Sequence, residues 1–528
     1  MHNLVRKNFD RIVRWLLYLL VLAIPIENLP KRYFIPDFMR DVPFSVLWIA
    51  VILAILHYYL NKGEGETHSL PVLAKVYLII AICWPILCTL IGAMTFPFWD
   101  ESTNESLRNT KFVKSIAYFY PDIIQNDILL HLKFMNSMII KTVKDLILPL
   151  IGIPFFMYEF FKNKSLSYFI NTLINAAIIA ACVLTLYSLI EIPWILTGNE
   201  HLAGALKFIN LHLYDPENSH GWWPPLLWQG KQLRSFTYEP SFFGIFSMFL
   251  LPLIWYKALD KRSISVVVLV MIFTYMIYMT RARTAQIILL GELVLFILLS
   301  VWIKYQSWKR SITFIVVTVC ISFGLYLITP FVGRVLNEST NRNFSILAEA
   351  SQEAANYWGN DVASIASSSK RSNMARWGDT IALFKVGLNH PVCGVGTNFH
   401  SPYVVKQIPA FAKNDKEINL WISLMNEKGF PQSGIPVLNQ YAGIFAMYGV
   451  PGLVLFILPI FIIVFLFISH LKIFRGRKEI VFALIPLLGQ IACMASNHFF
   501  YTYPISLAFA GITILKVLEI HKGKTHSI

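Results

Sequence analysis

The chain alternates between long apolar stretches and short polar connections. A helix needs about 20 mainly apolar residues to cross a bilayer. The pattern therefore predicts twelve membrane-spanning helices, at residues 13–29, 43–60, 72–96, 143–161, 168–196, 241–257, 264–280, 284–303, 311–330, 437–468, 480–500 and 503–518. We predict an all-α polytopic membrane protein with about 12 transmembrane helices.

The stretch at 437–468 is too long for one straight span. Gly449, Pro451 and Gly452 are predicted to divide it into an interfacial helix and a true span. No internal repeat is evident in the sequence, which argues against a transporter built from inverted repeats.

Lysine and arginine are enriched in the cytoplasmic loops of membrane proteins. Here they collect in the amino-terminal tail, in every second connection and in the carboxyl tail, at Arg6, Lys7, Arg11, Arg14, Lys62, Lys162, Lys164, Lys257, Lys261, Arg262, Lys304, Lys309, Arg310, Lys472, Arg475, Arg477, Lys478, Lys516, Lys522 and Lys524. Both termini are therefore predicted to be cytoplasmic. Because these clusters carry most of the net charge of +15, the charge is a topology signal and predicts no nucleic-acid partner.

The same pattern divides the chain into three parts. Residues 1–330 hold transmembrane helices 1–9 with periplasmic segments at about 97–142 and 197–240, residues 331–436 form a large periplasmic loop, and residues 437–528 hold transmembrane helices 10–12 and a cytoplasmic tail. A connection as long as this loop is usually functional. We expect it to be mainly helical, with helices at about 344–357 and 374–388, a mobile connection at 360–373 and a turn-rich run at 390–396.

Composition narrows the class of protein further. The chain is 56% apolar and 14% charged, with a mean hydropathy of +0.57, which excludes an ordinary soluble enzyme and a disordered protein. Five of the six cysteines lie in apolar runs, and their spacing indicates neither a disulfide framework nor a zinc site. We expect no metal site and no cofactor. The first apolar run lacks a small-residue cleavage site, so we expect no cleaved signal peptide.

Arginines lie at three places next to or between predicted spans, where a charged side chain costs free energy. Arg234 precedes a predicted span by seven residues, Arg281 and Arg283 lie in a very short outer connection, and Arg376 opens a predicted loop helix. Ionisable groups at membrane depth are functional hypotheses by default. The planar arginine fork binds phosphate oxygens bidentately, so we expect these arginines to converge on a lipid pyrophosphate. The alternative is that Arg281 and Arg283 anchor helix ends at headgroup phosphates.

Acid–base candidates accompany the arginines. Glu239 follows Arg234 by five residues and is either a general base or the ion-pair partner of that arginine. Pro240 fits a first helical turn, which places Glu239 at the positive end of a helix and is expected to lower its pKa. His390 is expected to shape the turn that follows it, and His400 can approach a substrate.

Four stretches of this sequence resemble the bacterial O-antigen polymerase and O-antigen ligase superfamily. They are Arg234 to Gly244, Thr280 to Thr284, Arg376-Trp377 with the run His390 to Gly396, and Asn439-Gln440-Tyr441 with Gly449 to Gly452. The family's twelve-span layout, with a large periplasmic loop between the ninth and tenth spans, covers nearly the whole chain.

The resemblance separates two branches of this superfamily. Its ligases place a histidine before the residue matched by Asn439, followed after nine residues by glycines like Gly449 and Gly452. This chain has Leu438 at the histidine position, which favours the polymerase branch. Arg376 and Gly387 also reproduce an arginine–ten residues–glycine spacing that is similar to that of some polymerases.

The resemblance implies a surface polysaccharide polymerase, of O-antigen or capsule type, in the bacterial inner membrane. Such an enzyme transfers a growing glycan from undecaprenyl pyrophosphate to a lipid-linked repeat unit on the periplasmic face, as a metal-independent glycosyltransferase. We assign catalysis to Glu239, Arg281, Arg283 and Arg376, and substrate binding to Arg234, Tyr238, His390, His400 and Asn439. The expected partners are the lipid-linked oligosaccharide, the bilayer and a chain-length regulator protein. An O-antigen ligase or a related lipid-linked oligosaccharide transferase is the alternative, and a transporter or flippase of lipid-linked sugars is less favoured.

Overall fold

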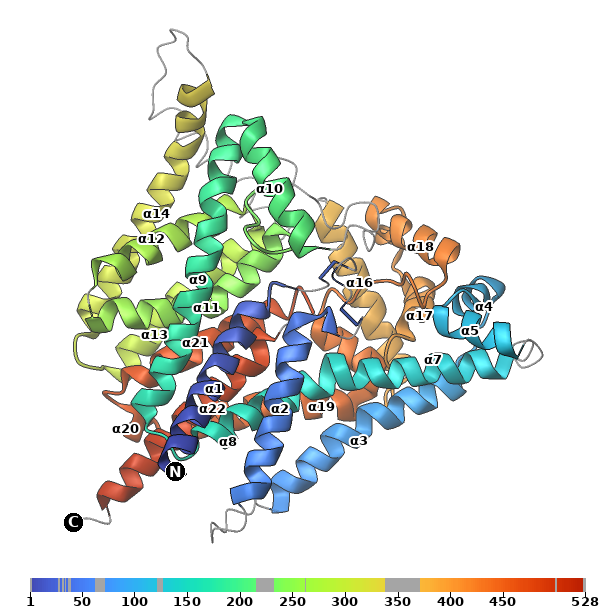
Figure 1. The fold of residues 1–528 in the computed structure, drawn as a ribbon, viewed down its shortest axis with the longest axis horizontal. Helices are drawn as coiled ribbons and strands as arrows, with labels where there is room; N and C mark the ends of the chain where they lie inside the picture. The colour runs from blue at the N-terminus through green and yellow to red at the C-terminus, as the bar shows by residue number, and fades with distance from the viewer. Residues whose placement is uncertain are drawn as a thin grey trace.

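The computed structural model describes residues 2–525, apart from 27–28, 31–32, 34, 37–38, 62–71, 121–126, 215–231, 262, 338–370 and 499–500. Every regular element among these residues is helical (Figure 1). The predicted all-α class is therefore confirmed. The predicted helix at 344–357 and most of the predicted connection at 360–373 lie outside the described residues.

Eight of the described helices are long and apolar enough to cross a membrane. They are α2 (Val42–Asn61), α3 (Val72–Met94), α9 (Leu166–Thr197), α11 (Pro240–Lys261), α13 (Arg283–Ile303), α14 (Trp308–Asn337), α19 (Gln440–Ser469) and α22 (Thr502–Thr525). The protein is thus a multi-pass membrane protein. The other four predicted spans are also helical, in α1 (His2–Ala23), η3 (Val143–Gly152) with α8 (Ile153–Phe161), α12 (Ile264–Met279) and α21 (Lys478–Cys493). The total of twelve spans remains a prediction.

Two predicted helix ends were wrong. The first span was expected to reach residue 29, but α1 ends at Ala23, where the Ile26 N–H bonds the Ala23 carbonyl in a turn ahead of the α1–α2 connection. The span expected at 480–500 ends at Cys493. The chain turns there because the carbonyls of Met494 and Ala495 accept hydrogen bonds from the start of α19.

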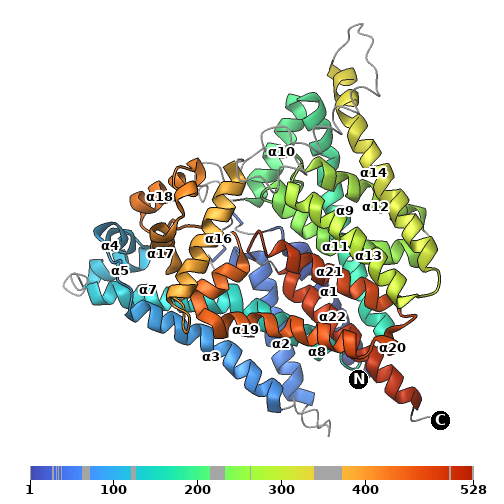
Figure 2. The ribbon, with the colours of Figure 1, turned by 180° about the vertical axis from the view of Figure 1, so that it is seen from behind.

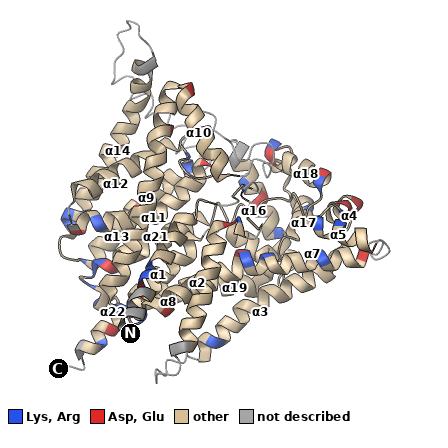
Figure 3. Cartoon of the chain, viewed as in Figure 1, with Lys and Arg blue, Asp and Glu red and all other residues tan. Residues whose placement is uncertain are grey.

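A single apolar core joins the spans. Its centre is α11, which packs against α21, α13, α12 and α9, and Trp255 of α11 is fully buried there. Seen from behind, α13, α21 and α22 lie next to one another along this core (Figure 2). Charged residues lie mainly near helix ends, and most of each span is uncharged (Figure 3).

The basic clusters that were predicted to be cytoplasmic meet at one end of the bundle. Lys164 Nζ lies 2.6 Å from a carboxylate oxygen of Asp10, and Lys516 Nζ donates to the Lys162 carbonyl at 2.9 Å. Lys478 pairs with Asp260 at 2.6 Å. The two termini lie near each other at this end (Figure 1). Which side of the membrane this end occupies remains a prediction.

The opposite end carries the short helices. From the predicted loop these are α16 (Arg371–Asn389), α17 (His400–Gln407), η7 (Ala410–Ala412) and α18 (Lys416–Lys428). They pack with α4 (Glu101–Arg108), α5 (Lys111–Phe119) and α7 (Asp127–Thr142) around a second apolar core, while α10 (Glu200–Leu213) lies against α9. The short α20 (Leu471–Phe474) follows α19. The helix predicted at 374–388 is confirmed by α16.

The predicted division of the long tenth span is confirmed by a kink in α19. Gly449 has φ 67° and ψ −168°, so the helical backbone breaks there. Pro451 has no N–H to donate to the carbonyl four residues earlier. The turn at 390–396 supplies the missing bonds, from Val395 N to the Ala446 carbonyl and from Gly396 N to the Met447 carbonyl, each at 2.9 Å.

Glycines let this turn approach its neighbours. Gly92 of α3 lies directly against the Val395 carbonyl, and a Cβ there would stand far inside van der Waals contact with backbone atoms. Gly394 has φ 62° and lies equally close to the backbone of Met447. Only glycine adopts both the left-handed backbone and this close approach without cost.

We predict that Gly92→Ala destabilises the protein by about 1–3 kcal/mol, because a methyl group must displace the backbone of the 390–396 turn. The matched control is Gly324→Ala in α14, where an added Cβ meets nothing within 4 Å, and which should be neutral or slightly stabilising. Thermal unfolding of the detergent-solubilised variants measures both. Equal midpoints for the two variants would contradict this account of the turn.

Candidate functional site

Charged side chains from four separate segments meet at the first turns of α16. The guanidinium of Arg376 interacts electrostatically with Glu239 before α11, Glu417 of α18 and Arg283 of α13. It also donates a short hydrogen bond to the Ser496 carbonyl, after α21. Two predicted catalytic residues, Glu239 and Arg283, thus lie within electrostatic range of a third, Arg376.

Glu239 lies immediately before Pro240, the first residue of α11, as the sequence predicts. Its carboxylate accepts a hydrogen bond of 2.6 Å from the Ser241 hydroxyl. Burial raises the pKa of Glu239, against the opposing effects of Ser241 and Arg376. The expected lowering of this pKa was therefore wrong, because desolvation outweighs the field of the helix end.

Arg281 lies in the short connection between α12 and α13, and Arg283 is the first residue of α13. Arg281 has φ 50°, a left-handed backbone conformation that is strained for a residue with a side chain. The turn is held by the Arg281 N–H, which donates to the Tyr278 carbonyl at 3.1 Å, and by the Ala282 N–H, which donates to the Thr280 hydroxyl at 3.1 Å. Both arginines are half-buried. Arg283 is thereby fixed as the first residue of α13.

Arg234 is 1% exposed. Its carboxylate partner is Glu191 and not Glu239, which the sequence suggested. The Glu191 carboxylate of α9 attracts the Arg234 guanidinium and accepts the N–H groups of Arg234 and Ser235 at 3.1 and 2.7 Å. The guanidinium also donates to the Thr237 carbonyl at 2.9 Å and lies 5.4 Å from the centre of the Tyr214 ring. Its expected contact with substrate remains a prediction.

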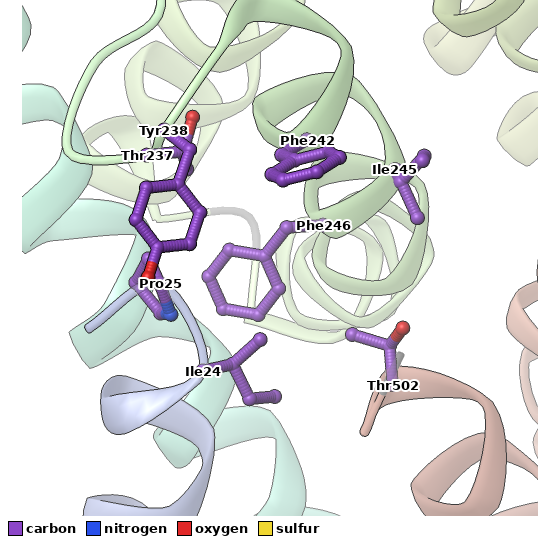
Figure 4. A pocket seen from close by; sticks show the side chains of 8 residues that line it. All are labelled: Ile24, Pro25, Thr237, Tyr238, Phe242, Ile245, Phe246 and Thr502. Carbon is purple, nitrogen blue, oxygen red and sulfur yellow. The ribbon is translucent and has the colours of Figure 1, made fainter. Parts of the chain in front are cut away.

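An apolar cleft borders Glu239. It is lined by residues just after α1, around the start of α11 and at the start of α22, namely Ile24, Pro25, Thr237, Tyr238, Phe242, Ile245, Phe246 and Thr502. The rings of Tyr238, Phe242 and Phe246 face this space (Figure 4). Tyr238, a predicted substrate-binding residue, is therefore a wall of the cleft.

The remaining predicted residues lie elsewhere or have structural partners. Asn439 caps α19, since its Oδ1 accepts the Ala442 N–H at 3.1 Å and its Nδ2 donates to the Ala495 carbonyl at 2.9 Å. His390 follows the last residue of α16, about 20 Å along that helix from Arg376. His400 is 4% exposed, its Nε2 lies 3.1 Å from the Ile435 carbonyl, and burial lowers its pKa to about 4.

The sequence reasoning missed two buried acids, Glu191 and Asp379. Glu191 lies inside an apolar run, where any ionisable residue is itself a signal. Asp379 follows Arg376 by one helical turn and is 1% exposed. Burial raises the pKa of Asp379 to about 7, against the Leu438 N–H and the charge of Arg376.

Residues 266–457 match the family model described as O-antigen ligase. This match supports the resemblance of the sequence to the O-antigen ligase/polymerase superfamily. Members of the superfamily are glycosyltransferase-like enzymes that act on lipid-linked sugars. The matched segment contains Arg281, Arg283 and Arg376, whereas Arg234 and Glu239 precede it. No curated protein and no solved structure matches the chain.

We predict that Arg234→Met and Glu191→Gln each destabilise the protein by about 3–5 kcal/mol, because either change leaves the other charge buried without its partner. The double variant should cost less than the sum of the two single changes. The exposed pair of Arg108 and Asp127, 3.2 Å apart, is the control, with single changes expected to cost at most about 1 kcal/mol. Unfolding measurements on all variants test the coupling, and additivity at Glu191 and Arg234 would refute it.

Proposed function

We propose that the protein is a surface polysaccharide polymerase of the bacterial inner membrane. It transfers a growing glycan from undecaprenyl pyrophosphate to a lipid-linked repeat unit on the periplasmic face. The observation that carries the proposal is the meeting of Arg376 with Arg283 and Glu239, in a chain that resembles a superfamily acting on lipid-linked sugars. A chain-length regulator is the protein partner that we propose.

Pyrophosphate is a good leaving group when its developing charge is neutralised. Preorganised cations achieve this without reorganising during the reaction. Arg376 and Arg283 supply two such cations, and Arg281 lies two residues before Arg283. The strained turn at Arg281 supports a functional role, since strained backbone clusters at active sites. Arg234 stiffens the segment that leads to Glu239.

The acceptor hydroxyl must lose a proton as the new bond forms. In the proposed step its oxygen attacks the anomeric carbon, the bond from that carbon to the pyrophosphate oxygen breaks, and Glu239 takes the proton. Burial raises the pKa of Glu239, which makes its carboxylate a stronger base than an exposed glutamate. Because the ionised form is required, activity should fall as the pH drops through this raised pKa. His390 and His400 are reserve candidates.

The apolar cleft fits the other end of the donor. Its lining is almost entirely apolar, and it borders Glu239 through Tyr238 and Phe242. An isoprenoid chain placed there loses contact with water, which stabilises binding by about 25 cal/mol per Å² of apolar surface. We place the first units of the lipid carrier along this apolar lining, with the pyrophosphate at the arginines.

Leu438 favours a polymerase over the second candidate, an O-antigen ligase. The ligases of this superfamily are expected to have a histidine at this position. Here the Leu438 N–H donates to an Asp379 carboxylate oxygen at 2.9 Å, and the side chain has no group that transfers protons. A transporter of lipid-linked sugars would need no catalytic base, so the Glu239 site argues against it.

We predict that Arg376→Ala reduces polymerisation by about 10²–10³-fold, the usual effect of removing one preorganised charge donor. Surface polysaccharide from the native host, with the gene deleted and then complemented by each variant, is separated on a gel. The expected result is loss of the long ladder, with single repeats still attached to their final acceptor. Arg108→Ala, which changes an exposed arginine, should restore the ladder. Long chains stranded on the lipid carrier would indicate a ligase instead.

We also predict that a chelator leaves turnover unchanged, because the proposed site neutralises the pyrophosphate with arginines and not with a divalent ion. Purified protein is assayed with lipid-linked repeat units, before and after treatment with EDTA and dialysis. Loss of turnover that added Mg²⁺ or Mn²⁺ restores would contradict the electrostatic scheme.

A further inference from the structure

Asp379 is the one acid of the site that has a buried oxygen without a hydrogen-bond partner. Its Oδ2 accepts the Leu438 N–H at 2.9 Å, and its buried Oδ1 has no hydrogen-bond partner. The side chain is 1% exposed. A buried carboxylate in such a place is costly unless a cation compensates its charge.

Arg376 is the cation that acts on Asp379. The two residues are three apart on α16, so their side chains lie on the same face of the helix. Arg376 donates to the Ser496 carbonyl while Asp379 accepts from Leu438. The pair therefore holds the start of α16 against both the start of α19 and the segment after α21.

The other charged groups at this place act on Arg376. They are Glu239 before α11, Glu417 of α18 and Arg283 of α13. His400 of α17 is turned to the Ile435 carbonyl. No charged group other than Arg376 acts appreciably on Asp379 among the described residues. An anionic ligand that binds the guanidinium of Arg376 thus neutralises the positive charge that stabilises ionised Asp379.

We propose that Asp379 is the resident counter-ion of Arg376 and takes up a proton when a lipid-linked diphosphate occupies that guanidinium. This inference rests on the proposed function, because it requires Arg376 to bind the diphosphate. Asp379 is a positioning residue in this scheme. It holds the guanidinium in place in the empty site and becomes neutral when the anionic substrate arrives, so it does not repel that substrate.

The sign of the pH dependence follows from this exchange. In the free protein the pKa of Asp379 is about 7. Below that pH the group already carries its proton, so binding takes up none. Above it each binding event takes up one proton, and affinity should fall towards a limit of about tenfold per pH unit.

The test uses the purified full chain and P1-geranyl-P2-methyl diphosphate, a diester whose two charges do not titrate near neutral pH. Isothermal calorimetry gives the affinity between about pH 6 and pH 8.5, and two buffers of different ionisation enthalpy at about pH 8 give the number of protons taken up. We expect uptake of close to one proton by the native protein. Asp379→Asn should bind without that proton and about thirtyfold more tightly at pH 8.5, since the neutral amide still accepts the Leu438 N–H.

Asp415→Asn is the matched control, because Asp415 is a 2% exposed carboxylate that caps α18 and asparagine caps helices equally well. It should bind like the native protein at every pH. Equal pH slopes for the native protein and Asp379→Asn would overturn the proposal, as would the absence of proton uptake by the native protein. If that variant does not fold, the absence of proton uptake by the native protein in the two-buffer measurement still overturns the proposal. Binding that survives Arg376→Ala would refute the proposed function itself.

Discussion

The helical backbone of α19 breaks at Gly449, and the three carbonyls before the break, at Ala446, Met447 and Tyr448, accept hydrogen bonds from outside the helix. An unpaired backbone group within a bilayer costs several kcal/mol, so the rest of the structure must supply donors. The 390–396 turn bonds the first two, and the Trp84 indole N–H of α3 bonds the third at 3.0 Å. The outer helices are therefore held against the membrane helices by backbone hydrogen bonds that the kinked helix requires, in addition to apolar packing.

The position of Arg376 follows from that fastening. The turn continues directly from α16, and α16 packs along the first half of α19. Gly387 permits this, since a Cβ there would collide with the Phe445 ring. With its far end fixed by the turn and its side fixed by Gly387, α16 can place Arg376 only over the start of α19. The arginine–ten residues–glycine spacing thus has a structural explanation. It places Arg376 and Gly387 on the same helix, and the close contact of Gly387 with Phe445 helps to set the position of that helix.

The sequence predicts those features that depend on local pattern. Apolar runs give the helices, and the glycine–proline group gives the break at Gly449, because both signals lie within a few residues. It does not predict which carboxylate pairs with which arginine. Glu239 was considered as the partner of Arg234, which lies five residues away, yet Glu191 from another helix has that position. The pKa of Glu239 was misjudged for the same reason: the helix end is visible in the sequence, whereas the burial that outweighs it appears only after folding.

Burial also explains why a site of mixed charge can serve an anionic substrate. Desolvation penalises the charged form of every group, but it shifts carboxyl groups towards neutrality near physiological pH while arginine stays charged. Glu239 and Asp379 both have raised pKa values. The site can therefore become more cationic once a diphosphate enters, because Asp379 takes up a proton while the arginines keep theirs and Glu239 stays ionised as the proposed base. Lysine or histidine in place of Arg376 would lose this asymmetry, because their ordinary pKa values are lower than that of arginine and burial brings them closer to physiological pH.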